Sequence, residues 1–143
     1  MKRYIFLQDP ILHYEVDEQP TIQEIHSRLS KGIPYSSFED LAEHLPLTNK
    51  EWAMVLGVSD RTLQRWFNDH PRIDGLTAER VFELARLTVI ALDVFHSGKV
   101  FADWLRTAHP DFDGETPFSI MQSHAGIELV KSLLLRLMHG VVV

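Results

Sequence analysis

Side chains that can read DNA lie close together between residues 59 and 68, with one more just upstream. Arginine pairs with guanine and glutamine with adenine, while threonine and lysine can hold phosphates. Asp60 and Asp69 beside the arginines favour the alternative, a helical core unit whose surface merely happens to be polar. The residues that the pattern predicts to contact DNA are Lys50, Ser59, Arg61, Thr62, Gln64, Arg65 and Asn68.

The run from Thr48 to Trp66 predicts two short helices joined by a tight turn at Gly57. Thr48 and Glu51 form a capping box that opens the first helix, and Ser59 caps the second. In such a helix-turn-helix the second helix lies in the major groove and the first abuts the DNA backbone. Because one short helix reads too few base pairs alone, we expect contact by a dimer. The inward-facing residues are expected to be Val58, Leu63 and either Trp66 or Phe67.

The charge of the chain argues against a general nucleic-acid coat. Its 14 Lys and Arg residues are outnumbered by 20 Asp and Glu residues, which gives a net charge of −6, whereas a coat of that kind is basic. Residues 48–72 form the one stretch that is not negative, with four basic residues against three acidic ones. We therefore expect local DNA contact with weak electrostatic affinity.

Helix signals fill most of the remaining sequence and predict an all-α fold. Capping boxes open the predicted helices at Thr21 and Ser36, Thr77 caps a long helix, and Pro117 occupies the first position of a later one. The segment Lys2–Leu7 could be a short strand or an arm, and Asp9–Pro20 an extended or mobile lead-in. The helices are expected at Thr21–Ser30, at Ser36 to His44 or Leu45, from Thr77 to about Ser97, at Val100–Thr107, from Thr116–Pro117 onward, and at Ser123–Met138.

The long third helix is apolar on most of its faces, which leaves two alternatives. It is either central in the core or shared with another subunit. One side carries Val81, Leu84, Ala85, Thr88, Leu92 and Phe95, and the other carries Phe82, Leu87, Ile90 and Val94.

An ordered series of residues near the C-terminus resembles a known family. The series is Trp104-Leu-Arg-Thr-Ala-His-Pro110, Asp113-Gly-Glu-Thr-Pro117, Ser123-His-Ala-Gly126, Val130, Leu134 and His139-Gly-Val141. It resembles the toxin-binding domain of the Xre/MbcA/ParS antitoxins, and Gly57-Val-Ser-Asp-Arg-Thr-Leu-Gln-Arg65 resembles the Xre-like helix-turn-helix that precedes it in the family. The resemblance covers about residues 32–143. The chain departs from the family pattern at Asp113, at Ser123 and in the less basic ending Trp66-Phe-Asn-Asp69.

The resemblance implies an antitoxin of a type II toxin–antitoxin pair. Such proteins bind a cognate toxin, commonly a RES toxin that resembles ADP-ribosyltransferases and consumes NAD, and they dimerise and repress their own operon. The implied organisation is an N-terminal extension (1–20), an Xre-like helix-turn-helix domain (21–75) and a small helical domain for dimerisation and toxin binding (76–143). The expected toxin-binding residues are Trp104, Leu105, Pro110, Gly114, Pro117, Gly126, His139, Gly140, Val141, Val142 and Val143, of which Trp104 and Pro117 could simply shape the surface.

Two features of this C-terminal part have a physical interpretation of their own. Gly126 near a helix start costs about 1 kcal/mol relative to alanine, which indicates close approach of a backbone, either from a neighbouring molecule or from a crossing helix. The ending from His139 is apolar with a free carboxylate. We hypothesise that it enters a cleft on the toxin, blocks substrate entry and pairs with a cationic group there. The alternative is a tail folded back on its own core.

Other kinds of site find little support in the sequence. The eight histidines show no pair at short ligand spacing and the chain has no cysteine, so we expect neither metal nor cofactor. Asp111, Asp113 and Glu115 lack the spacing of an EF-hand. Without a nucleophile elbow, phosphate loop or dinucleotide fingerprint, we do not expect an enzyme. The sequence also suggests a soluble cytoplasmic protein with no membrane partner. The alternative function is a stand-alone helix-turn-helix transcriptional regulator whose C-terminal module dimerises or senses a ligand.

Overall fold

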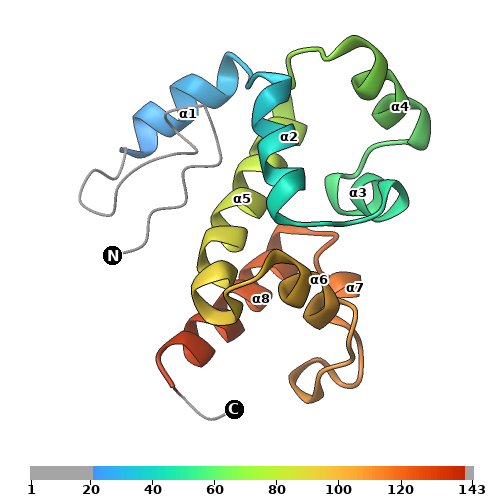
Figure 1. Ribbon diagram of the computed structural model, residues 1–143. Coiled ribbons are helices and arrows are strands. Elements are labelled where there is room, and N and C mark those ends of the chain that lie inside the picture. The colour runs from blue at the N-terminus through green and yellow to red at the C-terminus, as the bar shows by residue number, and fades with distance from the viewer. Residues whose placement is uncertain (1–20, 141–143) are drawn as a thin grey trace.

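The structure is a computed structural model that describes residues 21–140, apart from the side chains at positions 22, 25 and 28. Over this range the all-α prediction is confirmed. The suggested strand at Lys2–Leu7 and the lead-in up to Pro20 lie outside the described residues. The helices are α1 (Ile22–Ser30), α2 (Tyr35–His44), α3 (Asn49–Leu56), α4 (Asp60–Asp69), α5 (Gly75–Phe95), α6 (Gly98–Leu105), the short 3-10 helix η1 (Pro110–Phe112), α7 (Pro117–Ile120) and α8 (His124–Met138) (Figure 1).

Helix α5 is the central element of the core. It packs against α1, α2 and α3 and also against α6 and α8. Figure 1 shows α1 and α2 along its upper part and α6 and α8 along its lower part. A central position in the core therefore accounts for a helix that is apolar on most faces. Its buried residues come from both predicted sides and include Val81, Phe82, Leu84, Ala85, Leu87, Thr88 and Leu92, while Ile90, Val94 and Phe95 are half-buried.

Most helix starts lie where the sequence predicted them, because a side chain at each start satisfies a free backbone N–H. At Thr21 the hydroxyl accepts from the Glu24 N–H at 3.1 Å, and the Glu24 carboxylate accepts from the Thr21 N–H at 3.0 Å. The same reciprocal box joins Thr48 and Glu51. Single hydroxyl caps open the helices that follow Ser59, Thr116 and Ser123.

Three predicted starts were wrong. Helix α6 begins at Gly98 and not at Val100, because the Ser97 hydroxyl caps it by accepting from the Val100 N–H at 3.2 Å. The other two starts lie beside one non-local contact. Ile33 and Ile73 form an antiparallel bridge, with N–H to carbonyl distances of 2.7 and 2.9 Å. Helix α2 begins at Tyr35, directly after this bridge, with Pro34 as its N-cap, so the predicted box at Ser36 falls inside the first turn. Helix α5 begins at Gly75 in the same way, two residues before the predicted cap at Thr77.

Helix α6 is held at both ends to the connection between α2 and α3. At its start, a Cβ on Gly98 would overlap the carbonyl oxygen of His44, so the two backbones touch there. At its end, Arg106 donates to both carboxylate oxygens of Glu51 at 2.9 Å and to the carbonyl of Pro46 at 3.1 Å. The C-terminal helices are thereby fixed to the helix-turn-helix. Within residues 21–140, none of the helices combines the length and apolar character that crossing a bilayer requires.

Candidate functional site

Helix α4 carries most of the predicted DNA-contacting residues, and its start is fixed by hydrogen bonds. The Ser59 hydroxyl accepts from the Thr62 N–H at 3.0 Å and donates to the Thr62 hydroxyl at 3.0 Å. The preceding turn at Gly57 has φ +68°, a left-handed conformation that glycine adopts without strain. Arg80 of α5 donates to the Val55 carbonyl at 2.9 Å and so fixes the end of α3 beside the turn. The predicted helix–turn–helix is confirmed.

The inner face of α4 is anchored by aromatic packing. Leu63 and Trp66 are 2% and 4% exposed, so of the two alternatives Trp66 is the aromatic residue that faces inward. Val58 and Phe67 are half-buried. The ring of Phe38 meets Trp66 edge-on at 5.4 Å and Trp52 of α3 at 5.1 Å, measured between centroids. This arrangement is favourable for aromatic pairs, and it holds α3 and α4 on α2.

The far end of α4 and the residues after it contact the start of α2 and the segment before it. His70, which ends α4 in a left-handed conformation, stacks on Tyr35 with ring centroids 4.4 Å apart. Burial, and secondarily the charge of Glu39, raises the pKa of Tyr35. Arg72 donates to the Gly32 carbonyl at 2.7 Å. Arg72 is therefore engaged in the fold, although it contributes to the positive charge of residues 48–72.

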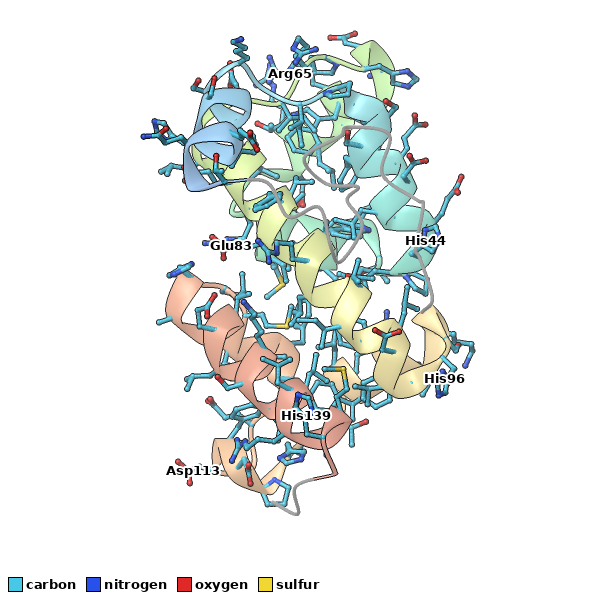
Figure 2. All side chains as sticks on the ribbon, turned by 90° about the vertical axis from the view of Figure 1, so that its left-hand side faces the viewer. His44, Arg65, Glu83, His96, Asp113 and His139 are labelled. Atoms are coloured by element: carbon cyan, nitrogen blue, oxygen red, sulfur yellow. The ribbon has the colours of Figure 1, made fainter. Side chains whose placement is uncertain are left out.

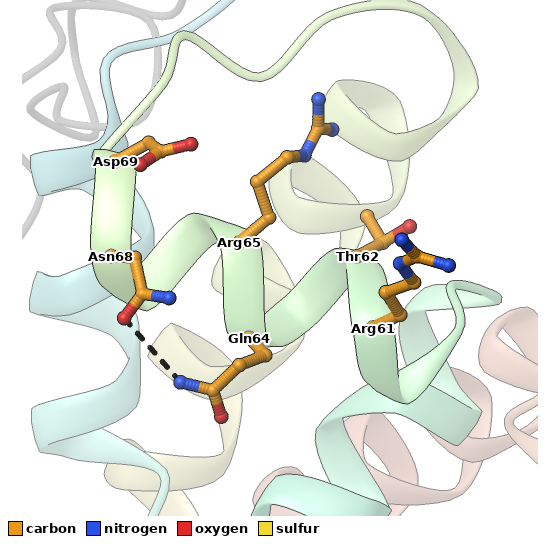
Figure 3. Close-up of a pocket in the computed structure, with 6 residues that line it drawn as sticks. All are labelled: Arg61, Thr62, Gln64, Arg65, Asn68 and Asp69. Atoms are coloured by element: carbon orange, nitrogen blue, oxygen red, sulfur yellow. Dashed lines mark hydrogen bonds between the residues drawn. The ribbon is translucent and has the colours of Figure 1, made fainter.

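The outer face of α4 is an exposed polar surface, as predicted. Arg61, Gln64, Arg65 and Asn68 are exposed, and Thr62 is partly so. Two open hollows flank this face. The first is lined by Arg61, Thr62, Gln64, Arg65, Asn68 and Asp69 (Figure 3). The second is lined by Asn49, Lys50, Asp60, Leu63, Gln64 and Phe67, which brings Lys50 of α3 beside α4. The structure thus collects the predicted polar residues on one surface, with Ser59 and Thr62 serving the helix cap.

The predicted toxin-binding residues separate into buried and exposed ones. Leu105, Pro117 and Gly126 are buried and Trp104 is half-buried. A Cβ on Gly126 would overlap the carbonyl oxygen of Ile120, so the close backbone approach comes from the α7 end of the same chain. The exposed members are Pro110, Gly114, His139 and Gly140, while Val141, Val142 and Val143 lie outside the described residues.

The exposed members lie around a corner formed by η1 and the end of α8. The His109 N–H donates to the Glu115 carbonyl at 3.0 Å, and the His109 ring nitrogen accepts from the Asp111 N–H at 3.1 Å. Arg136 of α8 pairs with Asp111 at 3.4 Å. Figure 2 shows Asp113 and His139 at one end of the molecule and Arg65 at the other, so the two predicted surfaces lie far apart.

The ion pair between Glu51 and Arg106 was not predicted as part of either surface. The Arg106 guanidinium, helped by the Thr48 cap, lowers the pKa of Glu51 from 4.5 to about 2, against the opposing effect of burial. The pair also raises the pKa of Arg106. Its one sequence signal was the capping box, which identifies Glu51 but gives no hint of Arg106. Among the described residues, no cluster of three or more His, Cys, Asp or Glu side chains could hold a metal ion.

Known proteins resemble both parts of the chain. The family model "Antitoxin Xre-like helix-turn-helix domain" matches residues 24–86. A second model, "Antitoxin Xre/MbcA/ParS C-terminal toxin-binding domain", matches residues 91–140. Antitoxin Xre of Pseudomonas putida is 25% identical over 126 residues, which cover 88% of this chain and 78% of the relative.

The fold is also found in a solved structure. A chain of the crystal structure of the M. tuberculosis MbcT–MbcA toxin–antitoxin complex superposes with a TM-score of 0.62 at 21% identity, covering 76% of this chain and 96% of that one. The two matched domains in their order and the curated relative lead to one conclusion: the chain is an antitoxin of a toxin–antitoxin system, in which an Xre-like helix-turn-helix domain precedes an Xre/MbcA/ParS toxin-binding domain.

Proposed function

We propose that this antitoxin binds and inhibits a RES-type toxin that consumes NAD, and that it represses its own operon as a DNA-binding dimer. The observation that carries the proposal is the position of the two predicted surfaces at opposite ends of the molecule (Figure 2). An antitoxin built in this way can hold a toxin at the η1–α8 corner without covering α4. The solved M. tuberculosis neighbour comes from a toxin–antitoxin complex, which supports a protein toxin as partner. The RES type rests on the resemblance of the Trp104–Val141 series to the family pattern.

The DNA-binding part of the proposal rests on the outer face of α4. Its exposed arginines and amides are the residue types that pair with base edges and phosphates. Lys50 lies in the first turn of α3, where the backbone N–H groups also favour a phosphate. The flanking Asp60 and Asp69 limit the net positive charge, so one copy gains little from phosphates alone. Two copies on two half-sites supply the missing contacts.

Replacing Arg61 with alanine is expected to weaken binding to the operator duplex at least tenfold. If Arg61 binds a phosphate, the slope of log K against log salt falls by about 0.9 for each protomer; if it pairs with guanine, the loss depends on the base instead. Fluorescence anisotropy at several salt concentrations separates the two cases. Lys99→Ala is the matched control, because it removes one positive charge from an 81% exposed side chain on α6. Equal losses in the two variants would refute contact by Arg61.

Co-expression with the neighbouring open reading frame tests the toxin-binding part. If that frame encodes the toxin, we expect it to arrest growth alone, and the full chain to restore growth and co-purify with it. A chain cut after Gly140 is expected to form the complex but neutralise poorly, if residues 141–143 block the toxin. A harmless neighbour, or one that forms no complex, would instead favour the stand-alone regulator. NAD levels in the arrested cells decide whether the toxin consumes NAD.

A further inference from the structure

We infer that Gln64 and Asn68 act together to read an adenine in the DNA major groove. The inference rests on the proposed DNA binding and specifies what the outer face of α4 recognises. The two side chains lie one helical turn apart and are both exposed. The Gln64 side-chain amide donates to the Asn68 carbonyl oxygen at 3.5 Å (Figure 3). Figure 3 shows Arg65 pointing away from this pair, so the amides form a separate reading group.

The hydrogen bond between the amides determines which groups they still offer. It engages Oδ1 of Asn68 and one hydrogen on Nε2 of Gln64. Gln64 keeps its carbonyl oxygen Oε1 as an acceptor and the second hydrogen on Nε2 as a donor. Among the described residues, nothing else bonds these two groups. The Gln64 amide therefore presents one acceptor and one donor side by side, and the hydrogen bond to Asn68 favours one orientation of that amide.

Adenine is the base that matches this acceptor and donor. Its major-groove edge presents the N7 acceptor and the N6 amino donor, so that Nε2 of Gln64 can donate to N7 while Oε1 of Gln64 accepts from N6. Guanine presents two acceptors and leaves Oε1 of Gln64 without a donor. Thymine offers an acceptor and a methyl group, and cytosine offers a donor alone. A polar group that is buried at an interface without a partner loses its hydrogen bonds to water and gains none in return. Each wrong base therefore lowers the binding affinity.

The position of Gln64 places the pair near the centre of the surface. Gln64 lines both hollows, the one that contains Arg61 and Arg65 and the one that contains Lys50 and Asp60. A duplex that contacts the basic residues on either side must therefore pass over Gln64. Central contacts lose their water most completely, and hydrogen-bond matching there discriminates best between bases.

Selection from a randomised duplex library with the purified full chain tests the inference. We expect adenine at one position of each half-site, preferred over guanine by on the order of tenfold or more. Gln64→Ala is expected to lose this preference and Asn68→Ala to weaken it, while both variants still bind DNA through the arginines. Gln122→Ala, which truncates an exposed glutamine between α7 and α8, is the matched control and keeps it. A bound consensus without adenine, or one that both variants retain, overturns the inference and leaves DNA binding intact.

A base analogue tests the individual atoms. We expect 7-deazaadenine, which lacks the N7 acceptor, to weaken binding of the unaltered protein, but by no more than Gln64→Ala does. If Nε2 of Gln64 donates to N7, the analogue should weaken the Gln64→Ala variant no further. Additive losses would overturn the assignment. If the full chain selects no duplex at all, the proposed DNA binding fails together with this inference, an outcome distinct from binding without adenine.

Discussion

Alanine at position 126 is expected to lower the free energy of unfolding by about 3 kcal/mol, although alanine is the better helix former. Its helix propensity favours the variant by about 1 kcal/mol. Against this, the new Cβ would overlap the Ile120 carbonyl oxygen and lie 2.6 Å from the carbonyl carbon. Both atoms belong to backbone, which cannot rotate away as a side chain can. The end of α7 or the start of α8 must therefore move, and we expect this cost to exceed the gain in propensity.

Urea denaturation followed by circular dichroism measures the effect of Gly126→Ala. Gly140→Ala is a suitable control, because a Cβ there meets no atom within 4 Å and the substitution affects only a left-handed residue with φ +71°. That strain costs about 1 kcal/mol. An alanine variant at 126 that is as stable as the unaltered protein would contradict the close contact between α7 and α8.

The second large effect is expected at Glu51, where glutamine should lower the free energy of unfolding at pH 7 by about 2 kcal/mol. The carboxylate both caps α3 through Thr48 and receives two hydrogen bonds from Arg106. Glutamine has one carbonyl oxygen for these partners and no charge. The Arg106 side chain is 37% exposed, so water screens part of the lost attraction and keeps the effect moderate.

The effect of Glu51→Gln should depend on pH in one direction. Since the fold lowers the pKa of Glu51 to about 2 from 4.5, the carboxylate stabilises the fold fully above pH 4.5. This contribution disappears as the pH falls toward 2, because the carboxylate is then protonated in the folded protein as well. The stability difference between the unaltered protein and the glutamine variant should therefore shrink over that range. If the difference in free energy of unfolding stayed constant with pH, the charge of Glu51 would not contribute to stability. Asp103→Asn, at a 56% exposed partner of Arg106, should have a smaller effect.

Local signals made most helix boundaries predictable. A hydroxyl cap such as Ser59 or Ser123 acts on an N–H within three residues of itself, so the sequence alone contains the whole interaction. The starts of α2 and α5 were not predictable in this way, because the bridge between Ile33 and Ile73 joins positions far apart in the chain. The two hydrogen bonds of the bridge fix the backbone at Ile33 and Ile73, and α2 and α5 each begin two residues later, at Tyr35 and Gly75.

The candidate site divides along the same line. The outer and inner faces of α4 followed from helical periodicity, and Leu63 and Trp66 lie inward as predicted. Arg106 reaches Glu51 across 55 positions of sequence, and no spacing rule connects two charges at that separation. The C-terminal series identified an ordered set of positions. It could not distinguish residues that shape the surface from inside the fold from residues that are exposed to a partner. The structure places Leu105 and Gly126 inside the fold, so the exposed residues around η1 are the ones that stay predicted as partner contacts.

The attachment of α6 to the α2–α3 connection limits how such antitoxins can be recombined. A chimera that joins this helix-turn-helix to the C-terminal half of a relative replaces Gly98 and Arg106 but keeps His44, Pro46 and Glu51. The chimera would then divide the contacts of Gly98 with His44 and of Arg106 with Pro46 and Glu51 between two parent proteins. A crossover point inside helix α5 does not avoid this. A workable exchange of toxin specificity must carry residues 44–51 along with the C-terminal half. We expect natural recombination between relatives to be constrained in the same way.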